Sequence, residues 1–371
     1  MRFLRACKNA AGRWCCNFSA LAKRRRADGA PPTLLRQVRK VGISLEKRKA
    51  LSFLESFDDE PATVLDWVTS QTIMRVVYFF IRNGPLSWFR GPKPDMLHPH
   101  SERELIHIPS GDGKRTISVH VYRPKHVKAE NQPKGLVLCF HGGGMTIGSA
   151  YNDEFAMALL NEENLPFVLA SVEYRLAPEH VFPAALDDCE AALRFFASEK
   201  GSKMVGIDRS RIVIAGCSAG GGLAAAVAQT ARNESIKLLG QLLVVPMLEL
   251  PSTWSYERFR DNPGLSKSDM LFFWRSYFGL DLFSGDISSV TFDNERSCPL
   301  RGDANDLAPA FIYVSSRDVL RAEGEMYYEK LARANVPVFF HRGRGTHVGS
   351  LFLDAGGGSI ARKAAAAFFT L

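Results

Sequence analysis

The residues best suited to chemistry in this chain centre on a serine in a glycine-bounded turn. Residues 216–220 read Gly-Cys-Ser-Ala-Gly, which fits the pattern G-x-S-x-G. A short apolar run precedes them and a helical pattern of small residues follows, as a nucleophile turn between strand and helix requires. Gly216 and Gly220 remove side chains that would clash in such a turn. Ser218 would then lie at a helix N-terminus, where developing negative charge is favoured. The alternative is a glycine-rich turn with an incidental serine.

Two further residues could activate this serine. A serine hydroxyl needs a histidine to accept its proton and a carboxylate to fix the tautomer of that histidine. In chains with this type of turn, the acid and then the histidine follow the serine. Asp318 comes just after the apolar run 311–314, and His347 lies in a glycine-containing segment after the run 338–340. We therefore predict a catalytic triad of Ser218, Asp318 and His347, suited to acyl transfer.

The other histidines and acids fit these roles less well. His341 ends a predicted strand and is expected to be structural or on the surface. Glu323 and Glu325 fit the helical pattern that follows. Six further histidines precede the serine and are disfavoured by chain order: His98, His100, His107, His120, His126 and His180.

A glycine-rich loop could stabilise the negative charge of an acyl-transfer reaction. Three glycines, residues 142–144, follow His141 directly after a short apolar run. Acyl transfer needs N–H groups aimed at the carbonyl oxygen as it becomes an oxyanion. Gly142 and Gly143 could donate from this loop, and Ala219 from the nucleophile turn. We expect His141 to order the loop through hydrogen bonds and not to act as a base. The alternative for the glycines is a flexible loop.

The elements that must position these residues alternate along the chain. Helical patterns separate most of the apolar runs, which implies strand–helix–strand units and a mostly parallel sheet with helices on both faces. Burial on both faces explains why the runs are continuously apolar. The expected strands are 117–122, 136–140, 168–174, 212–215, 242–245, 311–314 and 338–340, and the helices 154–161, 184–198, 223–232 and 323–334.

Composition divides the chain into four parts. Residues 1–30 form a basic leader, and residues 31–105 read as N-terminal helices. Residues 106–247 and 307–371 carry the strand–helix rhythm. Between them, residues 248–306 are rich in aromatic side chains and have little strand pattern. We expect this insertion to be helical and to form a cap over the carboxyl end of the sheet, where ligands bind. Ordinary core packing of its rings is the alternative.

The net charge of +8 does not indicate a nucleic-acid partner. Eight Lys and Arg lie in the first 26 residues, and no acid precedes Asp28. Subtracting these eight from the 47 Lys and Arg leaves 39, which match the 39 Asp and Glu. The body of the protein is therefore neutral, and no basic surface need be invoked for it.

The leader is compatible with three interpretations. It resembles a mitochondrial transit peptide, being basic and free of acids, but a disordered basic tail fits equally. Peripheral membrane contact through the leader or the cap is a third option, and Cys15 and Cys16 could be acylated there. No transmembrane helix is expected, because the best candidate, residues 63–81, contains Asp66 and Arg75. We expect an intracellular protein, cytoplasmic or mitochondrial.

Cysteine usage favours a reducing compartment and argues against a metal site. The number of cysteines is odd, no C-x-x-C pair occurs, and no Cys and His cluster as in a zinc site. We therefore expect reduced thiols, no metal and no cofactor. The cysteines are Cys7, Cys15, Cys16, Cys139, Cys189, Cys217 and Cys298.

Taken together, these motifs resemble the hormone-sensitive lipase-like esterases, the group that includes arylacetamide deacetylase. The resemblance covers roughly residues 100–355. It implies an α/β-hydrolase fold with a helical cap built from the N-terminal helices and the aromatic-rich insertion. It also implies hydrolysis of short- to medium-chain acyl esters without a cofactor. The matching segments are His-Gly-Gly-Gly at 141–144, Tyr-Arg-Leu-Ala-Pro-Glu-His at 174–180, Phe-Pro-Ala-Ala at 182–185, the serine turn, Asp-Val-Leu-Arg at 318–321 and Glu-Gly-Glu at 323–325.

Three positions depart from the pattern of this family. Cys217 stands before the nucleophile where the family usually has Asp or Glu, and Met145 stands where a bulky aromatic is common. Thr346 and Val348 replace the usual neighbours of the histidine. Cys217 is a poor candidate nucleophile, since its side chain would leave the turn in another direction.

Two other functions compete with the esterase. One is a non-catalytic ligand-binding protein on the same fold, as in the plant gibberellin receptors, which resemble this family and have lost the catalytic histidine. The other is a peptidase, which usually brings a large additional domain for which this chain has no room. Because Ser218, Asp318 and His347 are all present, the sequence favours an enzyme acting on a small acyl ester.

Overall fold

A computed structural model of the 371-residue chain describes residues 101–124, 135–152, 167–262, 264–280, 287 and 294–347. The predicted basic leader, nearly all of the predicted N-terminal helices and the predicted helix 154–161 lie outside the described residues.

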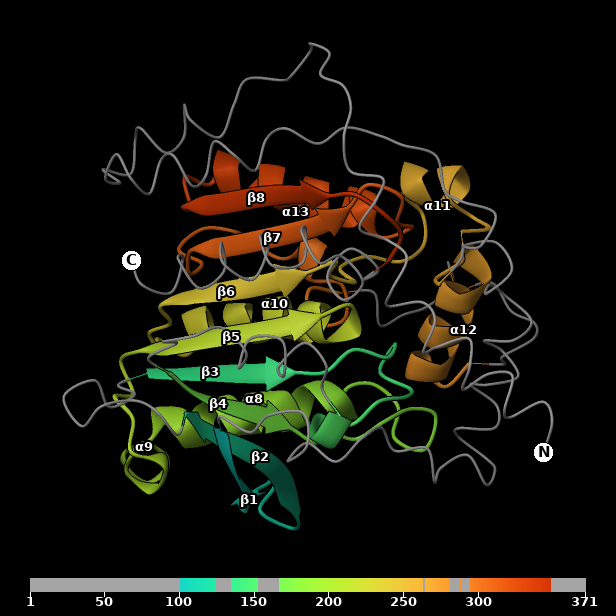
Figure 1. Cartoon of the computed structure of the whole chain (residues 1–371). Helices are drawn as coiled ribbons and strands as arrows, with labels where there is room; N and C mark the ends of the chain where they lie inside the picture. The colour runs from blue at the N-terminus through green and yellow to red at the C-terminus, as the bar shows by residue number, and fades with distance from the viewer. Residues whose placement is uncertain are drawn as a thin grey trace, which may run out of the picture.

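The described residues form one eight-stranded sheet (Figure 1). Its spatial order is β1-β2-β4-β3-β5-β6-β7-β8. β2 pairs antiparallel with both of its neighbours, and all other pairs are parallel. The strands are β1 (Ser101–Pro109), β2 (Thr116–Pro124), β3 (Gly135–Phe140), β4 (Phe167–Val172), β5 (Ile212–Cys217), β6 (Gly240–Val244), β7 (Ala310–Ser315) and β8 (Val338–Gly343).

Burial explains the composition of the central strands. Every residue of β3, β4, β5, β6 and β7 is buried, so an alternating polar pattern would place polar groups in the core. On one face the sheet is covered by α8 (Ala184–Ala197), α10 (Ala219–Asn233) and α13 (Arg321–Arg333), as Figure 1 shows. A short helix, α9 (Glu199–Val205), follows α8 and begins at the N-cap Ser198.

The register brings the ends of the parallel strands to one edge. Phe140, the last residue of β3, is opposite Gly216 of β5. Val244, the last residue of β6, is opposite Cys217 on one side and Tyr313 on the other. The loops that leave β3, β5, β6, β7 and β8 therefore start from the same edge of the sheet, where ligands bind in open α/β sheets.

The aromatic-rich insertion, residues 248–306, is hereafter called the cap segment. Its described part contains α11 (Trp254–Arg258), α12 (Lys267–Phe278) and η6 (Pro299–Arg301). Figure 1 shows α11 and α12 beyond the carboxyl ends of the strands. A capping box of Ser266 and Asp269 begins α12, and Gly279 at φ +71° ends it. Several of its rings also pack in the core, including Trp274, which is fully buried.

The expected fold class is confirmed: a mostly parallel sheet with packed helices, in which all seven predicted strands occur. One boundary is wrong. The sequence predicts that residues 101–105 belong to the N-terminal helices, but they are part of β1. Among the described strands, β1 pairs only with β2, and its residues Glu102, Arg103 and Glu104 are exposed. An edge strand of this kind carries charged residues and lacks the continuous apolar run that is typical of the central strands. The sequence pattern therefore does not predict β1.

Within these described ranges, none of the helices combines the length and the hydropathy needed to span a bilayer.

Candidate active site

The serine turn joins β5 to α10 and holds Ser218 in an unusual backbone conformation. Ser218 has φ +58° and ψ −120°, which costs a residue with a Cβ on the order of 1–3 kcal/mol. Neighbouring backbone groups compensate for this strain. The Ser218 N–H donates to the Val244 carbonyl at 2.8 Å, and the Ser218 carbonyl accepts from Gly222 and Met247, each at 3.1 Å.

The glycines of this turn are required by close backbone contacts. A Cβ added at Gly216 would lie 2.1 Å from the Gly220 carbonyl oxygen, and one at Gly220 would lie 1.9 Å from that of Phe140. In both cases the obstacle is backbone that cannot rotate away. The turn packs against the end of β3 only because both positions lack side chains.

The three predicted triad residues meet at this turn. His347 Nε2 lies 3.0 Å from Ser218 Oγ, and His347 Nδ1 lies 2.7 Å from Asp318 Oδ2. The other oxygen of Asp318 accepts from the Leu320 N–H at 3.0 Å. The Asp318 side chain is 1% exposed and that of His347 is 10% exposed. Ser218 itself is half-buried.

The loops that carry the acid and the histidine extend the pairing of β7 and β8. Beyond the strand ends, the Ser316 N–H donates to the Gly343 carbonyl at 2.8 Å and the Arg317 N–H to that of Gly345 at 2.9 Å. Gly345 has φ +112°, a conformation that favours glycine. Asn262 of the cap segment also donates to the Arg317 carbonyl. These bonds fix the Asp318 and His347 loops relative to each other.

The glycine loop after β3 also approaches the serine turn. Gly143 and Gly144 have φ of +115° and +61°, and the Gly143 carbonyl accepts from two following N–H groups at 3.0 Å. A Cβ added at Gly142 would lie 3.6 Å from the Ser218 Cβ. Ala219 begins α10, and N–H groups of a first helical turn have no acceptor within the helix. Gly142 and Ala219 are thus both close to Ser218 in the backbone.

His141 orders the glycine loop, as the sequence predicts. Its Nδ1 donates to the Gly142 carbonyl at 2.8 Å. Its ring stacks on Tyr174 at a centroid distance of 4.1 Å, and the Tyr174 hydroxyl donates to the His141 carbonyl at 2.7 Å. Burial lowers the pKa of His141 to about 4. The ring is therefore neutral at pH 7.

The segment 174–180 supports this loop, a role that its match to the family did not reveal. Arg175 donates to both carboxylate oxygens of Asp188 through its Nε and Nη2 at 3.0 and 2.9 Å. Asp188 is 1% exposed and also binds Arg115. The pair anchors the backbone directly after Tyr174, which contacts His141. The local sequence does not predict that Asp188 supports this loop, because its partner Arg175 lies 13 residues away in the chain.

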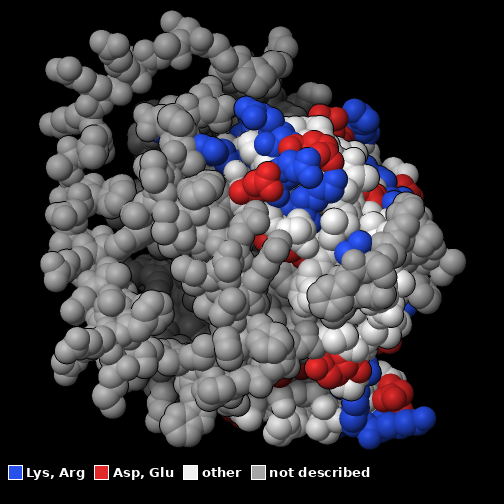
Figure 2. All heavy atoms as spheres, turned by 90° about the vertical axis from the view of Figure 1, so that its right-hand side faces the viewer, with Lys and Arg blue, Asp and Glu red and all other residues white. Residues whose placement is uncertain are grey.

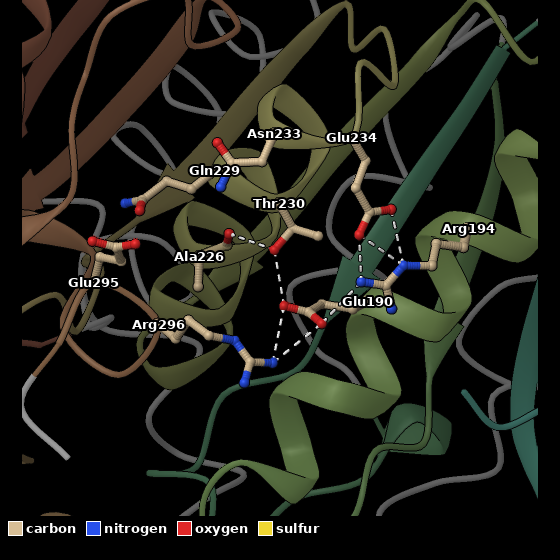
Figure 3. A pocket seen from close by; sticks show the side chains of 9 residues that line it. All are labelled: Glu190, Arg194, Ala226, Gln229, Thr230, Asn233, Glu234, Glu295 and Arg296. Carbon is tan, nitrogen blue, oxygen red and sulfur yellow. Dashed lines mark hydrogen bonds and ion pairs between the residues drawn. The ribbon is translucent and has the colours of Figure 1, made fainter. Parts of the chain in front are cut away.

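A separate pocket lies between α8 and α10 (Figure 3). Its volume is about 310 Å³, and no triad residue lines it. Arg296 of the cap segment contacts Asp187 and Glu190, while Arg194 contacts Glu190 and Glu234. Figure 3 shows Arg296 turned toward Glu190, and Arg194 turned toward Glu190 and Glu234. The network therefore attaches the cap segment to α8.

Charge at the carboxyl edge is mixed in sign. Figure 2 shows Lys and Arg beside Asp and Glu on this face. In the described part of the cap segment, Glu257 pairs with Lys267 and Arg260. Such exposed ion pairs contribute little to stability. Among the residues the structure covers, no group of three or more His, Cys, Asp or Glu could hold a metal ion.

Comparison with known proteins identifies the protein family to which this chain belongs. The sequence profile of the α/β-hydrolase fold matches residues 137–350, and the chain belongs to this family. Carboxylesterase NlhH of Mycobacterium tuberculosis is 37% identical over 234 residues, which cover 61% of this chain and 69% of that protein. Arylacetamide deacetylase of Bos taurus is 40% identical over 176 residues, covering 44% and 42%. The resemblance seen in the sequence is therefore confirmed.

Solved structures agree with this assignment. A bacterial heroin esterase superposes with a TM-score of 0.66 at 28% identity, covering 88% of this chain and 96% of the other. An esterase from Pyrobaculum calidifontis gives a TM-score of 0.67 at 27% identity, covering 84% and 99%.

We predict that His141→Asn makes stability less sensitive to acid. The asparagine amide keeps a donor for the Gly142 carbonyl but does not titrate. Because the folded-state pKa of His141 is lowered from 6.5 to about 4, its contribution is present above pH 6.5 and is lost as pH falls toward 4. The full loss is about 3 kcal/mol. Denaturant unfolding at pH 7 and pH 4.5 should therefore show a smaller drop for the variant. Parallel drops would refute the assignment of a buried neutral ring.

We also predict that Gly220→Ala destabilises the protein by about 1–3 kcal/mol or more. The new Cβ would collide with the Phe140 carbonyl, and the strand cannot move without breaking its pairing with β5. Gly111→Ala is the matched control, since nothing lies within 4 Å of its Cβ. The unfolding midpoints of both variants are measured by thermal unfolding followed by circular dichroism. Equal midpoints for Gly220→Ala and the parent would contradict the close contact.

Proposed function

We propose that this protein hydrolyses carboxylic esters through an acyl-enzyme formed on Ser218. The observation that carries the proposal is the position of His347, which bridges Ser218 Oγ at 3.0 Å and Asp318 Oδ2 at 2.7 Å. Relatives named carboxylesterase and esterase support the reaction class.

In the proposed reaction, His347 Nε2 takes the Ser218 proton as Oγ attacks the ester carbonyl. Asp318 holds the Nδ1–H and stabilises the imidazolium that forms. The oxyanion is bound by the N–H groups of Gly142, Gly143 and Ala219. His347 then protonates the leaving alcohol. Water, deprotonated by the same histidine, attacks the acyl-enzyme. The acid leaves as the bond to Ser218 Oγ breaks, and His347 returns the proton to Oγ.

The alternative is a non-catalytic ligand-binding protein of the same fold. It has no need for a histidine hydrogen-bonded to both a serine and a buried carboxylate. The two contacts of His347 therefore favour the enzyme. A protein that binds esters but never turns them over would support the alternative.

We further propose substrates with short- to medium-chain acyl groups, in line with the resemblance to the hormone-sensitive lipase-like esterases. From the basic segment 1–30 we also propose a cytoplasmic or mitochondrial location. We propose membrane contact through this leader or through the cap. Turnover of p-nitrophenyl esters of graded acyl length tests the proposed preference for short- to medium-chain acyl groups. Highest activity on long, insoluble esters would instead indicate a lipase.

Two substitutions test the triad. Ser218→Ala should abolish both turnover of p-nitrophenyl acetate and covalent labelling by a fluorophosphonate, because the attacking oxygen is gone. Asp318→Asn should lower kcat about 10⁴-fold, because the amide favours the wrong histidine tautomer. Asp303→Asn, on the exposed surface, is the matched control and should leave kcat unchanged. Full activity of Ser218→Ala would disprove the mechanism.

A further inference from the structure

A carboxylate that takes no part in the proposed chemistry is buried at the edge of the site. Glu323 lies in the first turn of α13 and is 0% exposed. A buried carboxylate is costly unless hydrogen bonds satisfy its oxygens. Burial raises the pKa of Glu323 above its ordinary value, while the donors that surround it act in the opposite direction.

The three donors to Glu323 all come from the start of the cap segment. Its Oε2 accepts from the backbone N–H groups of Leu248 and Glu249, the latter at 2.9 Å. Its Oε1 accepts from the Tyr256 hydroxyl at 2.6 Å. A side chain on the helix after the acid loop therefore holds the backbone that leaves β6.

That backbone in turn supports the nucleophile turn. Met247, directly before Leu248, donates its N–H to the Ser218 carbonyl at 3.1 Å. The Met247 carbonyl also contacts α10, since a Cβ added at Gly222 would lie 2.1 Å from its oxygen. A shift of the chain at Leu248 would therefore be transmitted to Ser218 through one residue.

The same helix is attached to the acid. The Arg321 N–H donates to the Asp318 carbonyl at 3.1 Å. Ser255 of the cap segment donates its hydroxyl to the Val319 carbonyl at 2.6 Å and accepts from the Ala322 N–H at 3.2 Å. Between Asp318 and Glu323 the chain is thus fixed at several points and can act as a rigid link.

We propose that Glu323 is a positioning residue, which sets the distance between the Ser218 turn and the Asp318–His347 pair by holding the backbone after β6. The inference rests on the proposed function of Ser218 as nucleophile. Loss of the carboxylate leaves two buried N–H groups without acceptors and releases Met247, so that the serine hydroxyl moves away from His347.

The test compares Glu323→Ala, Glu323→Gln and Tyr256→Phe in the full chain. Active sites are first counted by complete fluorophosphonate labelling, so that kcat refers only to folded, reactive protein. Displacements on the order of 1 Å can cost 10²-fold in rate. We expect Glu323→Ala to lower kcat per titrated site by about 10–100-fold and the labelling rate by a similar factor, with KM for p-nitrophenyl acetate within about twofold of the parent.

The conservative variant should restore most of the rate. In Glu323→Gln the amide oxygen can accept from both backbone N–H groups, and the amide nitrogen can donate to the Tyr256 oxygen, whose hydroxyl hydrogen rotates away. Tyr256→Phe removes one donor of three and should lower kcat per site by about 3–10-fold, a fraction of the full misplacement effect. Glu329→Ala on the same helix, which pairs with Arg333 on the surface, is the matched control and should not change kcat.

Each outcome decides the matter. Parental kcat per titrated site in Glu323→Ala, even with lowered thermal stability, would show that Glu323 only stabilises the fold and would overturn the proposal. If Glu323→Ala does not fold, Tyr256→Phe decides. A lowered kcat per site would support the proposal, and a parental kcat per site would overturn it. Failure of the parent itself to be labelled at Ser218 would instead refute the proposed function.

Discussion

The structure depends on one strained residue and the contacts that compensate for it. Ser218 has a positive φ that residues with a Cβ rarely adopt. Its N–H and carbonyl are bonded to the backbone of β6 and the loop after it, and Gly216 and Gly220 allow the turn to close against β3. In this conformation the Ser218 hydroxyl oxygen lies 3.0 Å from His347 Nε2.

Parallel pairing explains how residues distant in the chain meet at this serine. β3, β5, β6, β7 and β8 all run in the same direction, so their following loops start at one edge. The pairing of β7 with β8 continues into their loops through backbone bonds at Ser316 and Arg317. Short connections of this kind leave little freedom to the side chains they carry, as a preorganised site requires.

The sequence predicted those features that depend on local pattern. Central strands are recognisable because burial on both faces requires continuous apolar runs. Ser218, Asp318 and His347 could be selected because each follows such a run. The strand β1 could not be recognised from the sequence, because its exposed residues Glu102, Arg103 and Glu104 are charged.

Glu323 shows a second limit. The sequence pattern predicts that Glu323 lies in a helix, and it does so in α13. The pattern does not predict that its side chain is buried. Only the fold brings the backbone of residues 248 and 249 against it, and no spacing in the sequence records that contact. The sequence does not predict the contact between His141 and Tyr174 for the same reason, since the two stacked rings lie 33 positions apart in the chain.

Buried polar groups near this edge share one arrangement. His141 is neutral and donates to a carbonyl of its own loop. Asp188 accepts from Arg175, and Glu323 accepts from two backbone N–H groups and a tyrosine. Burying each group costs free energy, and the cost is offset only when its partners stay in place. Each therefore penalises displacement of the loop it contacts. Apolar packing is non-directional and tolerates small shifts, so it could not fix loop geometry as narrowly as hydrogen bonding does.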